Sequence, residues 1–328
     1  MQRIRLGRTN VEVPAIGVGT WAHGGTNVDE RGEPVGWSGH DDTEAAAALV
    51  AAWEHGLTHW DTADVYGDGR AEALIGGLWN RVPRGEIFLA SKVGWDPGGY
   101  PHPYHPDLVR RRLERSLALL RTEVIDLYYL HHCDFGPGDR YLDGALEQLH
   151  RAREEGKIRF LGLSDWEPAR VAHLAPRVDP DVVQPFRNVV DDTYASSGLA
   201  AWVEAHDAGV AFFSPLKHGL LLGKYEAPVT FPEGDFRARI GEFGDARFVE
   251  RMRRAREAVA RRFPGHPEPV LHALTGVLLA DSPHACVLLG QRNPRHVAAA
   301  ARVGDALSPD DAAWVRRLYR GETELAPG

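Results

Sequence analysis

Short apolar segments alternate with helix-forming segments eight times along the chain, and this alternation restricts the fold more than any other feature. Apolar runs without alternating polar positions are typical of strands that are covered on both faces of a parallel sheet. The helical segments repeat apolar residues on one face, as Val109, Leu113, Leu117 and Leu120 do within residues 106–121. The eight segments that we expect to be strands are residues 13–20, 57–61, 87–93, 124–130, 159–164, 182–186, 210–214 and 285–289.

Two α/β layouts accommodate this alternation, a doubly wound open sheet and a (β/α)8 TIM barrel. The open sheet usually has fewer strands and a glycine-rich phosphate turn after the first strand. Eight units therefore favour the barrel. Residues 2–13 alternate polar and apolar around residues 7–10, which predicts an N-terminal β-hairpin that closes the bottom of the barrel. No linker or shift in composition divides the chain, so we expect residues 1–328 to form a single domain.

Composition excludes several classes of protein. The 328 residues carry a formal charge of −8 and give a pI near 6.1, which disfavours binding to nucleic acid. The two cysteines, Cys133 and Cys286, exclude a disulfide framework. No apolar run approaches the roughly 20 residues of a membrane span, and the N-terminus lacks the apolar core of a signal peptide. We therefore expect a cytoplasmic enzyme with no membrane or nucleic-acid partner, and nothing in the sequence indicates its oligomeric state.

The active site of a (β/α)8 barrel lies at the carboxyl ends of its strands. There the stretch WDTADVYG, residues 60–67, provides Asp61 and Tyr66. A tyrosine has an ordinary pKa of about 10, so it needs a nearby cation before it exchanges protons near neutral pH. Lys92 ends the next strand, where Asp61 would keep its ammonium group charged. We expect Lys92 to lower the pKa of Tyr66. With His131 from the following strand to orient a substrate oxygen, the four groups suit protonation of a carbonyl oxygen.

Each of these residues also has a plainer interpretation. Asp61 and Lys92 could form only a structural ion pair, and His131 could be a histidine satisfied within the core. His59 shares a strand face with Asp61 and could indicate a metal site. Metal-dependent barrels usually gather several histidine and carboxylate ligands at such ends, so we expect no metal. His132 should point away from His131, because strand residues alternate.

Seven motifs follow the expected strands in order: GVGTW at 17–21, DTADVYGDGRAEALIG at 61–76, SKVG at 91–94, IDLYYLHHCD at 125–134, GLSDW at 162–166, FFSPLKHGLLLGKY at 212–225 and LLGQRNPRHV at 288–297. With these motifs the sequence resembles the aldo-keto reductases over nearly its whole length. The resemblance implies a (β/α)8 barrel that acts as an NAD(P)(H)-dependent oxidoreductase. It also implies a catalytic tetrad, which falls on Asp61, Tyr66, Lys92 and His131.

The resemblance assigns further residues to the cofactor. Ser164, Asp165 and Gln184 would contact the nicotinamide carboxamide, and Phe213 would stack on the nicotinamide ring. Arg292 falls where a basic side chain contacts the adenosine 2′-phosphate, which favours NADP(H) over NAD(H). The full set implied to contact the cofactor is Gly19, Thr20, Trp21, Ser164, Asp165, Gln184, Phe213, Ser214, Pro215, Leu216, Gly219, Leu221, Lys224, Gly290, Arg292 and His296.

Four positions depart from the family pattern. Asp165 stands where asparagine is usual, and an ionised carboxylate cannot donate the amide hydrogen bond. His296 stands where glutamine or arginine is common. Ala299 and Ala300 replace an acid or amide and an asparagine that usually hold the adenine. The last three changes affect the adenine end of the site, and none of the four touches the tetrad.

We therefore predict an oxidoreductase that interconverts an aldehyde, ketone or sugar with its alcohol, with Tyr66 as general acid or base. Two other functions stay open, a non-catalytic NADP(H)-sensing regulatory module of the same fold and a metal hydrolase on the same barrel. Flat apolar faces near the site suit a sugar ring or an aromatic carbonyl. The aromatic residues that crowd the loops are Trp21, Trp37, Trp95, Tyr100, Tyr104 and Trp166.

Overall fold

The predicted barrel is confirmed by the computed structural model, which describes residues 2–29 and 31–322. Eight parallel strands close on themselves, with the last strand, β10, hydrogen-bonded to both β3 and β9. In chain order the barrel strands are β3 (Ile16–Gly19), β4 (His59–Asp61), β5 (Phe88–Val93), β6 (Ile125–Leu130), β7 (Ile158–Asp165), β8 (Val182–Pro185), β9 (Gly209–Phe212) and β10 (Ala285–Gly290).

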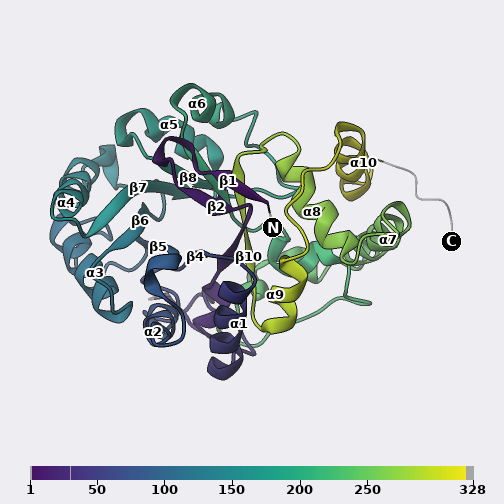
Figure 1. Cartoon of the computed structure of the whole chain (residues 1–328), viewed down its shortest axis with the longest axis horizontal. Helices are drawn as coiled ribbons and strands as arrows, with labels where there is room; N and C mark the ends of the chain where they lie inside the picture. Colours follow the sequence, from purple (N-terminus) through teal and green to yellow (C-terminus); the bar gives the residue numbers. More distant parts are fainter. Residues whose placement is uncertain (1, 30, 323–328) are drawn as a thin grey trace.

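Helices follow the strands and lie outside the barrel (Figure 1). They are α1 (Asp42–Glu54), α2 (Arg70–Gly76), α3 (Pro106–Leu119), α4 (Leu142–Glu154), α5 (Pro168–Val178), α6 (Leu199–His206), α7 (Ala246–Arg262), α8 (Pro269–Leu279), α9 (Pro294–Ala300) and α10 (Pro309–Arg320). α2 is short, because two poor helix formers, Gly76 and Gly77, follow each other at its end. In the described part of the chain, no helix has the length and apolar character needed to cross a bilayer.

The N-terminal hairpin lies at the bottom of the barrel, as predicted (Figure 1). β1 (Arg3–Arg5) pairs antiparallel with β2 (Glu12–Pro14) around a short 3-10 turn, η1 (Gly7–Thr9). A Cβ on Gly7 would lie 2.2 Å from the backbone nitrogen of Gly209, so the turn touches the first residue of β9. Arg8 forms ion pairs with two carboxylates that precede β8, at 2.8 Å and 3.4 Å. Both contacts hold the hairpin at the end opposite the expected active site.

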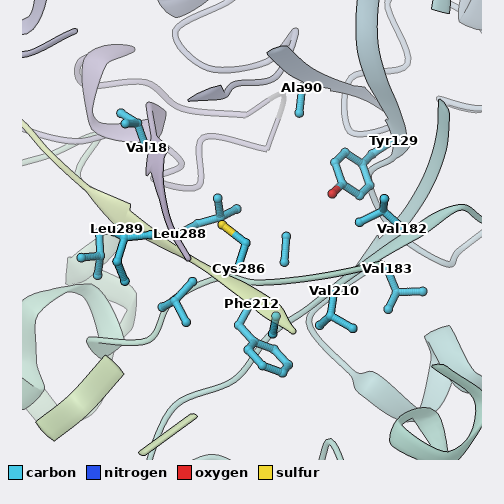
Figure 2. Close-up of a cluster of buried hydrophobic side chains, with 14 of the residues drawn as sticks. Val18, Ala90, Tyr129, Val182, Val183, Val210, Phe212, Cys286, Leu288 and Leu289 are labelled. Carbon is cyan, nitrogen blue, oxygen red and sulfur yellow. The ribbon is translucent and has the colours of Figure 1, made fainter. Parts of the chain in front are cut away.

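Side chains fill the interior of the barrel below its upper rim. Tyr129 on β6 and Cys286 on β10 come from opposite walls and both point towards the axis (Figure 2). A Cβ on Gly162 would lie 2.1 Å from the Tyr129 ring, so β7 needs a glycine there. Alternation along β5 places Lys92 towards the axis and Ser91 towards the helices. A reactive group on these strands can therefore meet a ligand only at the carboxyl rim.

Two long loops pair with each other above this rim. A backbone bridge joins Gly36, in the loop before α1, to Asp235, in the loop after β9. The amide of Gly36 donates to the Gly234 carbonyl at 3.1 Å, and the amide of Phe236 donates back to the Gly36 carbonyl at 2.8 Å. The buried carboxylate of Asp235 also accepts from the amide and hydroxyl of Ser38, at 2.9 Å and 2.5 Å. We call residues 34–39 and 233–239 the paired loops.

Candidate functional site

The rim brings Asp61, Tyr66, Lys92 and His131 together. Lys92 is fully buried, and its ammonium group donates to Asp61 Oδ1 at 2.5 Å, to the Thr62 carbonyl at 2.7 Å and to the Tyr66 hydroxyl at 3.3 Å. These three acceptors use all three protons of the ammonium group. The orientation of Lys92 is therefore fixed by the strand next to it.

Asp61 holds Lys92 from the barrel interior. Its second carboxylate oxygen accepts from the Gln184 side-chain amide at 2.8 Å, across the barrel on β8. Burial opposes the charge on Lys92, but Asp61 and Tyr66 outweigh it, so that the pKa of Lys92 is raised above its ordinary value. A buried ion pair with every oxygen engaged is the arrangement in which both charges persist.

The pKa of Tyr66 differs from the sequence prediction. Lys92 does lower it, but burial of the phenol is the larger effect, and the pKa of Tyr66 is raised above 10 overall. The expected lowering by Lys92 is present, but burial disfavours the phenolate by more than Lys92 stabilises it. Tyr66 therefore holds its proton at neutral pH.

His131 and His132 have opposite orientations. The His131 ring meets the Tyr66 ring edge to face, with centroids 5.9 Å apart. Burial, with help from Lys92, puts the pKa of His131 well below its usual value, so this imidazole is neutral. His132 Nε2 lies 2.5 Å from the Gly94 carbonyl, and its Nδ1 accepts from the Asp134 amide at 3.1 Å. His132 thus braces the chain that carries His131.

The three residues expected at the nicotinamide carboxamide lie together at the rim, but their polar groups are engaged. The Ser164 hydroxyl donates to the Gln184 carbonyl at 2.9 Å, and the Gln184 amide is bound to Asp61. Asp165 accepts from the amides of Cys133 and Glu167 at 2.7 Å and 2.8 Å. The acid that replaces asparagine therefore ties the end of β7 to the end of β6.

Aromatic side chains form a wall beside Tyr66. The Trp21 ring stacks on the Tyr66 ring with centroids 6.1 Å apart, and Phe213 meets the edge of Trp166 at 4.9 Å. The members of this wall, which we call the aromatic wall, are Trp21, Trp37, Trp166, His218 and Phe236. Of the other loop aromatics, Trp95 lies against His131 and His132, whereas Tyr104 bonds the backbone of His132 and Tyr100 packs on His105.

Basic side chains gather on the other side of the paired loops. Burial, then Arg237 and Arg292, lower the pKa of Lys224, and the pKa values of Arg292 and His296 are lowered as well. Arg292 donates to the Ser38 carbonyl at 2.8 Å and also to the Gly39 carbonyl. In the described residues Lys224 has no ion-pair partner within 4.0 Å. Mutually repelling cations of this kind fit an anionic ligand such as a cofactor phosphate.

The remaining residues of the expected cofactor set lie along the same rim. Gly19 pairs with Asp61 on one side and Gly290 on the other, and the Thr20 hydroxyl donates to the Asp61 carbonyl at 2.9 Å. The turn after β9 is held in an unusual conformation, with positive φ at Ser214 and Gly219. Its other members, Pro215, Leu216 and Leu221, form the base of the turn, in which the Leu216 carbonyl accepts from two amides.

Comparison with known sequences decides the family. The sequence model described as "Aldo/keto reductase family" matches residues 15–320.

The chain belongs to the aldo/keto reductase family.

Two curated aldo-keto reductases resemble the chain over much of its length. One from Strobilurus tenacellus is 32% identical over 90% of this chain and 87% of its own. One from Schizosaccharomyces pombe, whose name carries NADP(+), is 30% identical over 74% of this chain and 70% of its own. Together with the family, these relatives make the protein an NAD(P)H-dependent oxidoreductase.

Solved structures agree with the fold and the family. A glycerol dehydrogenase from Gluconobacter oxydans superimposes with a TM-score of 0.78 and 26% identity, covering 99% of this chain and 98% of that one. An aldo/keto reductase from Klebsiella pneumoniae, in complex with NADP and acetate, gives a TM-score of 0.69 and 25% identity over 97% and 95% of the two chains.

Sequence reasoning missed several groups at the site of this aldo-keto reductase. His218 and Phe236 join the aromatic wall, and Arg237 lies between the Trp37 and Phe231 rings at 4.6 Å and 4.2 Å. Phe236 and Arg237 belong to a long loop with glycine and proline, and His218 lies within the motif at 212–225 without a role assigned to it. Loop pairing leaves no periodic signal, so only the contacts reveal these residues.

Proposed function

We propose that this aldo-keto reductase uses NADPH to reduce the carbonyl group of an aldehyde, ketone or sugar, with Tyr66 as the proton donor. The observation that carries the proposal is the Tyr66 hydroxyl, which lies 3.3 Å from a buried, charged ammonium group at the open end of the barrel. A phenol with a cation beside it can lose its proton without leaving an uncompensated anion.

Each of the four side chains of the tetrad has its own role in the proposed reaction. The nicotinamide supplies a hydride to the carbonyl carbon when it is bound. Tyr66 gives its proton to the carbonyl oxygen, and Lys92 stabilises the phenolate that forms, while Asp61 keeps Lys92 charged and in place. His131, neutral because of burial and the neighbouring Lys92 charge, donates a hydrogen bond to the carbonyl oxygen and orients it. In the reverse reaction Tyr66 acts as the base.

The chain's basic cluster supports NADPH over NADH. Lys224, Arg292 and His296 are partly buried next to one another, so a 2′-phosphate would relieve their repulsion. The NADP(+)-named relative and the NADP complex of the similar structure point the same way. The nicotinamide end has Phe213 as a ring to stack on.

The direct test is the substitution Tyr66→Phe. The variant keeps the ring and the aromatic wall but has no proton to give, so kcat should fall by about a thousandfold or more. Titration of protein fluorescence with NADPH and with NADH measures binding separately, and the two dissociation constants should stay within about threefold of wild type. The same titration should show tighter binding of NADPH than of NADH.

A matched control is Tyr141→Phe, since that half-buried ring packs on His102 and His105 and not on a residue of the tetrad. It should leave kcat unchanged on a panel of aldehydes, ketones and sugars. Wild-type kcat in Tyr66→Phe would refute the assignment of Tyr66. Tight NADPH binding without turnover on the whole panel would instead indicate a cofactor-sensing module.

A further inference from the structure

A cluster of buried polar side chains lies behind the tetrad, on the outer face of the barrel wall. It lies where β5 and β6 meet α2 and α3. The Ser91 hydroxyl donates to Glu72 Oε1 at 2.6 Å, and Tyr128 faces the same space from β6. Because strand residues alternate, this cluster and Lys92 lie on opposite faces of one strand. Nothing in the mechanism above uses it.

Asp64 is the unusual member of this cluster. The residue is 1% exposed, and among the described residues neither of its carboxyl oxygens has a hydrogen-bond partner. The nearest cation is Arg112, whose Nε lies 3.8 Å from Asp64 Oδ2. A buried polar group without a partner costs about 1–3 kcal/mol. Such a group in a native structure therefore calls for an explanation.

The charges around Asp64 do not balance it. The groups that face it are Glu72 on α2, Arg112 and Arg115 on α3, and Tyr128 on β6. Asp68 and Asp96 lie in the loops beside the two arginines, and Lys92 points to the other face of β5. The two arginines are shared with the two loop acids, which are the solvent-exposed members of the set. Lys92 is already committed to Asp61. Among the described residues, Arg112 is the one cation within 4.0 Å of Asp64, and it is shared with both loop acids. Burial, then Glu72, outweigh the arginines and raise the pKa of Asp64 to about 7.

Asp64 is also connected to the catalytic tyrosine. It lies two residues before Tyr66, and its amide donates to the Lys92 carbonyl at 3.2 Å. The Tyr66 amide donates to the Ala63 carbonyl at 3.2 Å, which closes the turn between the two side chains. Burial is the main reason that the pKa of Tyr66 is raised, and the charge of Asp64 adds to it.

We propose that Asp64 is a positioning residue for this reaction: its unpartnered carboxyl group, held behind the Tyr66 turn, sets by its charge how tightly Tyr66 holds its proton. The proposal rests on the proposed role of Tyr66. When Asp64 is protonated, Tyr66 releases its proton more readily, which favours either direction of transfer. When Asp64 is ionised, Tyr66 holds its proton more tightly still, and the reverse reaction, in which Tyr66 is the base, is held back.

The test is an NMR titration of the protein labelled with 13C at the tyrosine Cζ, with the Tyr66 signal assigned by its loss in Tyr66→Phe. In wild type the Tyr66 signal should show a step near pH 7, where Asp64 ionises. The neighbouring histidines cannot produce it, because burial lowers the pKa of His132 to about 4 and that of His131 well below its ordinary value. Asp64→Asn should abolish the step.

Two further variants keep the test decisive. Asp68→Asn, which removes an exposed acid paired with the same two arginines, should keep the step and move its midpoint to lower pH, because both arginines then act on Asp64 with less competition. Glu72→Gln should move its midpoint to lower pH, since Glu72 raises the pKa of Asp64. A wild-type signal without a step near pH 7, a step that persists in Asp64→Asn, or one that Asp68→Asn removes would overturn the proposal. The readout needs no turnover, so it stands apart from the kinetic test of Tyr66→Phe.

Discussion

The buried polar side chains at this site are held in place by the hydrogen bonds that they form with one another. Lys92 uses its three protons on Asp61, Thr62 and Tyr66, and the free oxygen of Asp61 is closed by Gln184. Removing one partner leaves the other charge buried, and this costs more than the pair contributes when intact. The ion pair between Asp61 and Lys92, which lies beside Tyr66, therefore also affects the stability of the folded protein.

The substitution Lys92→Met should lower the free energy of unfolding by about 3–5 kcal/mol, because the Asp61 carboxylate then stays buried without its cation. Adding Asp61→Asn removes the orphaned charge and should restore part of that loss. Urea denaturation of the single and double variants measures both values. A double variant no more stable than Lys92→Met would refute the ion-pair explanation.

At the scale of elements, the end of strand β5 carries functional side chains towards the barrel axis and polar side chains towards the surrounding helices. On β5 the inner face carries Lys92 and the outer face carries Ser91, which binds Glu72 on α2. The packing of α2 and α3 on this wall encloses Asp64 and raises its pKa to about 7, chiefly by burial. A helix–strand contact thus has an electrostatic consequence that is measurable in the stability of the protein.

This contact predicts a dependence of stability on pH. The pKa of Asp64 is about 7 in the folded protein against 3.8 ordinarily, so between these values the folded state binds more protons than the unfolded state. Its contribution to stability therefore falls as pH rises through that window and is lowest above it. The free energy of unfolding of Asp64→Asn, relative to wild type, should rise by roughly 2–3 kcal/mol between about pH 5 and pH 8.

Urea denaturation of both proteins across this range is the measurement. Asp107→Asn serves as the control, since this side chain is 78% exposed and pairs with neither of those arginines, and the variant should show no such gain. Parallel wild-type and Asp64→Asn curves would mean that Asp64 titrates in the folded state as it does in the unfolded chain.

At the scale of the whole molecule, the two ends of the barrel have separate tasks. The hairpin of β1 and β2 covers the bottom, where Leu6 is fully buried and packs against Gly209. The tetrad and the paired loops occupy the opposite rim. In a (β/α)8 barrel, the residues at the bottom stabilise the fold and the loops at the upper rim carry the chemistry.

The substitution Leu6→Ala should therefore separate the two ends. Removing a fully buried leucine should cost about 2–5 kcal/mol of stability, yet KM and kcat at a temperature well below unfolding should stay within about twofold of wild type. Thermal denaturation and steady-state kinetics on one preparation provide the comparison. A large change in KM would show that the hairpin reaches the active site.

Sequence reasoning succeeded where the fold itself repeats. Eight apolar segments separated by helices predicted the barrel, because strands of this kind are buried on both faces and an open doubly wound sheet usually has fewer of them. Once the barrel was predicted, the carboxyl ends of β4, β5 and β6 were expected to meet at one rim. Asp61, Lys92 and His131 were therefore expected to lie close together there.

Only the tertiary structure showed the pKa values of the buried groups and which loops pair with each other. Burial set the pKa of Tyr66 above its ordinary value although Lys92 lies beside it. Asp165 turned out to bind two backbone amides, and Gly36 pairs with Asp235 about 200 positions later in the chain. Periodicity records which face of an element is buried. It carries no record of how deeply a polar group is enclosed or of which distant loop meets it, because those depend on contacts between elements that the sequence keeps apart.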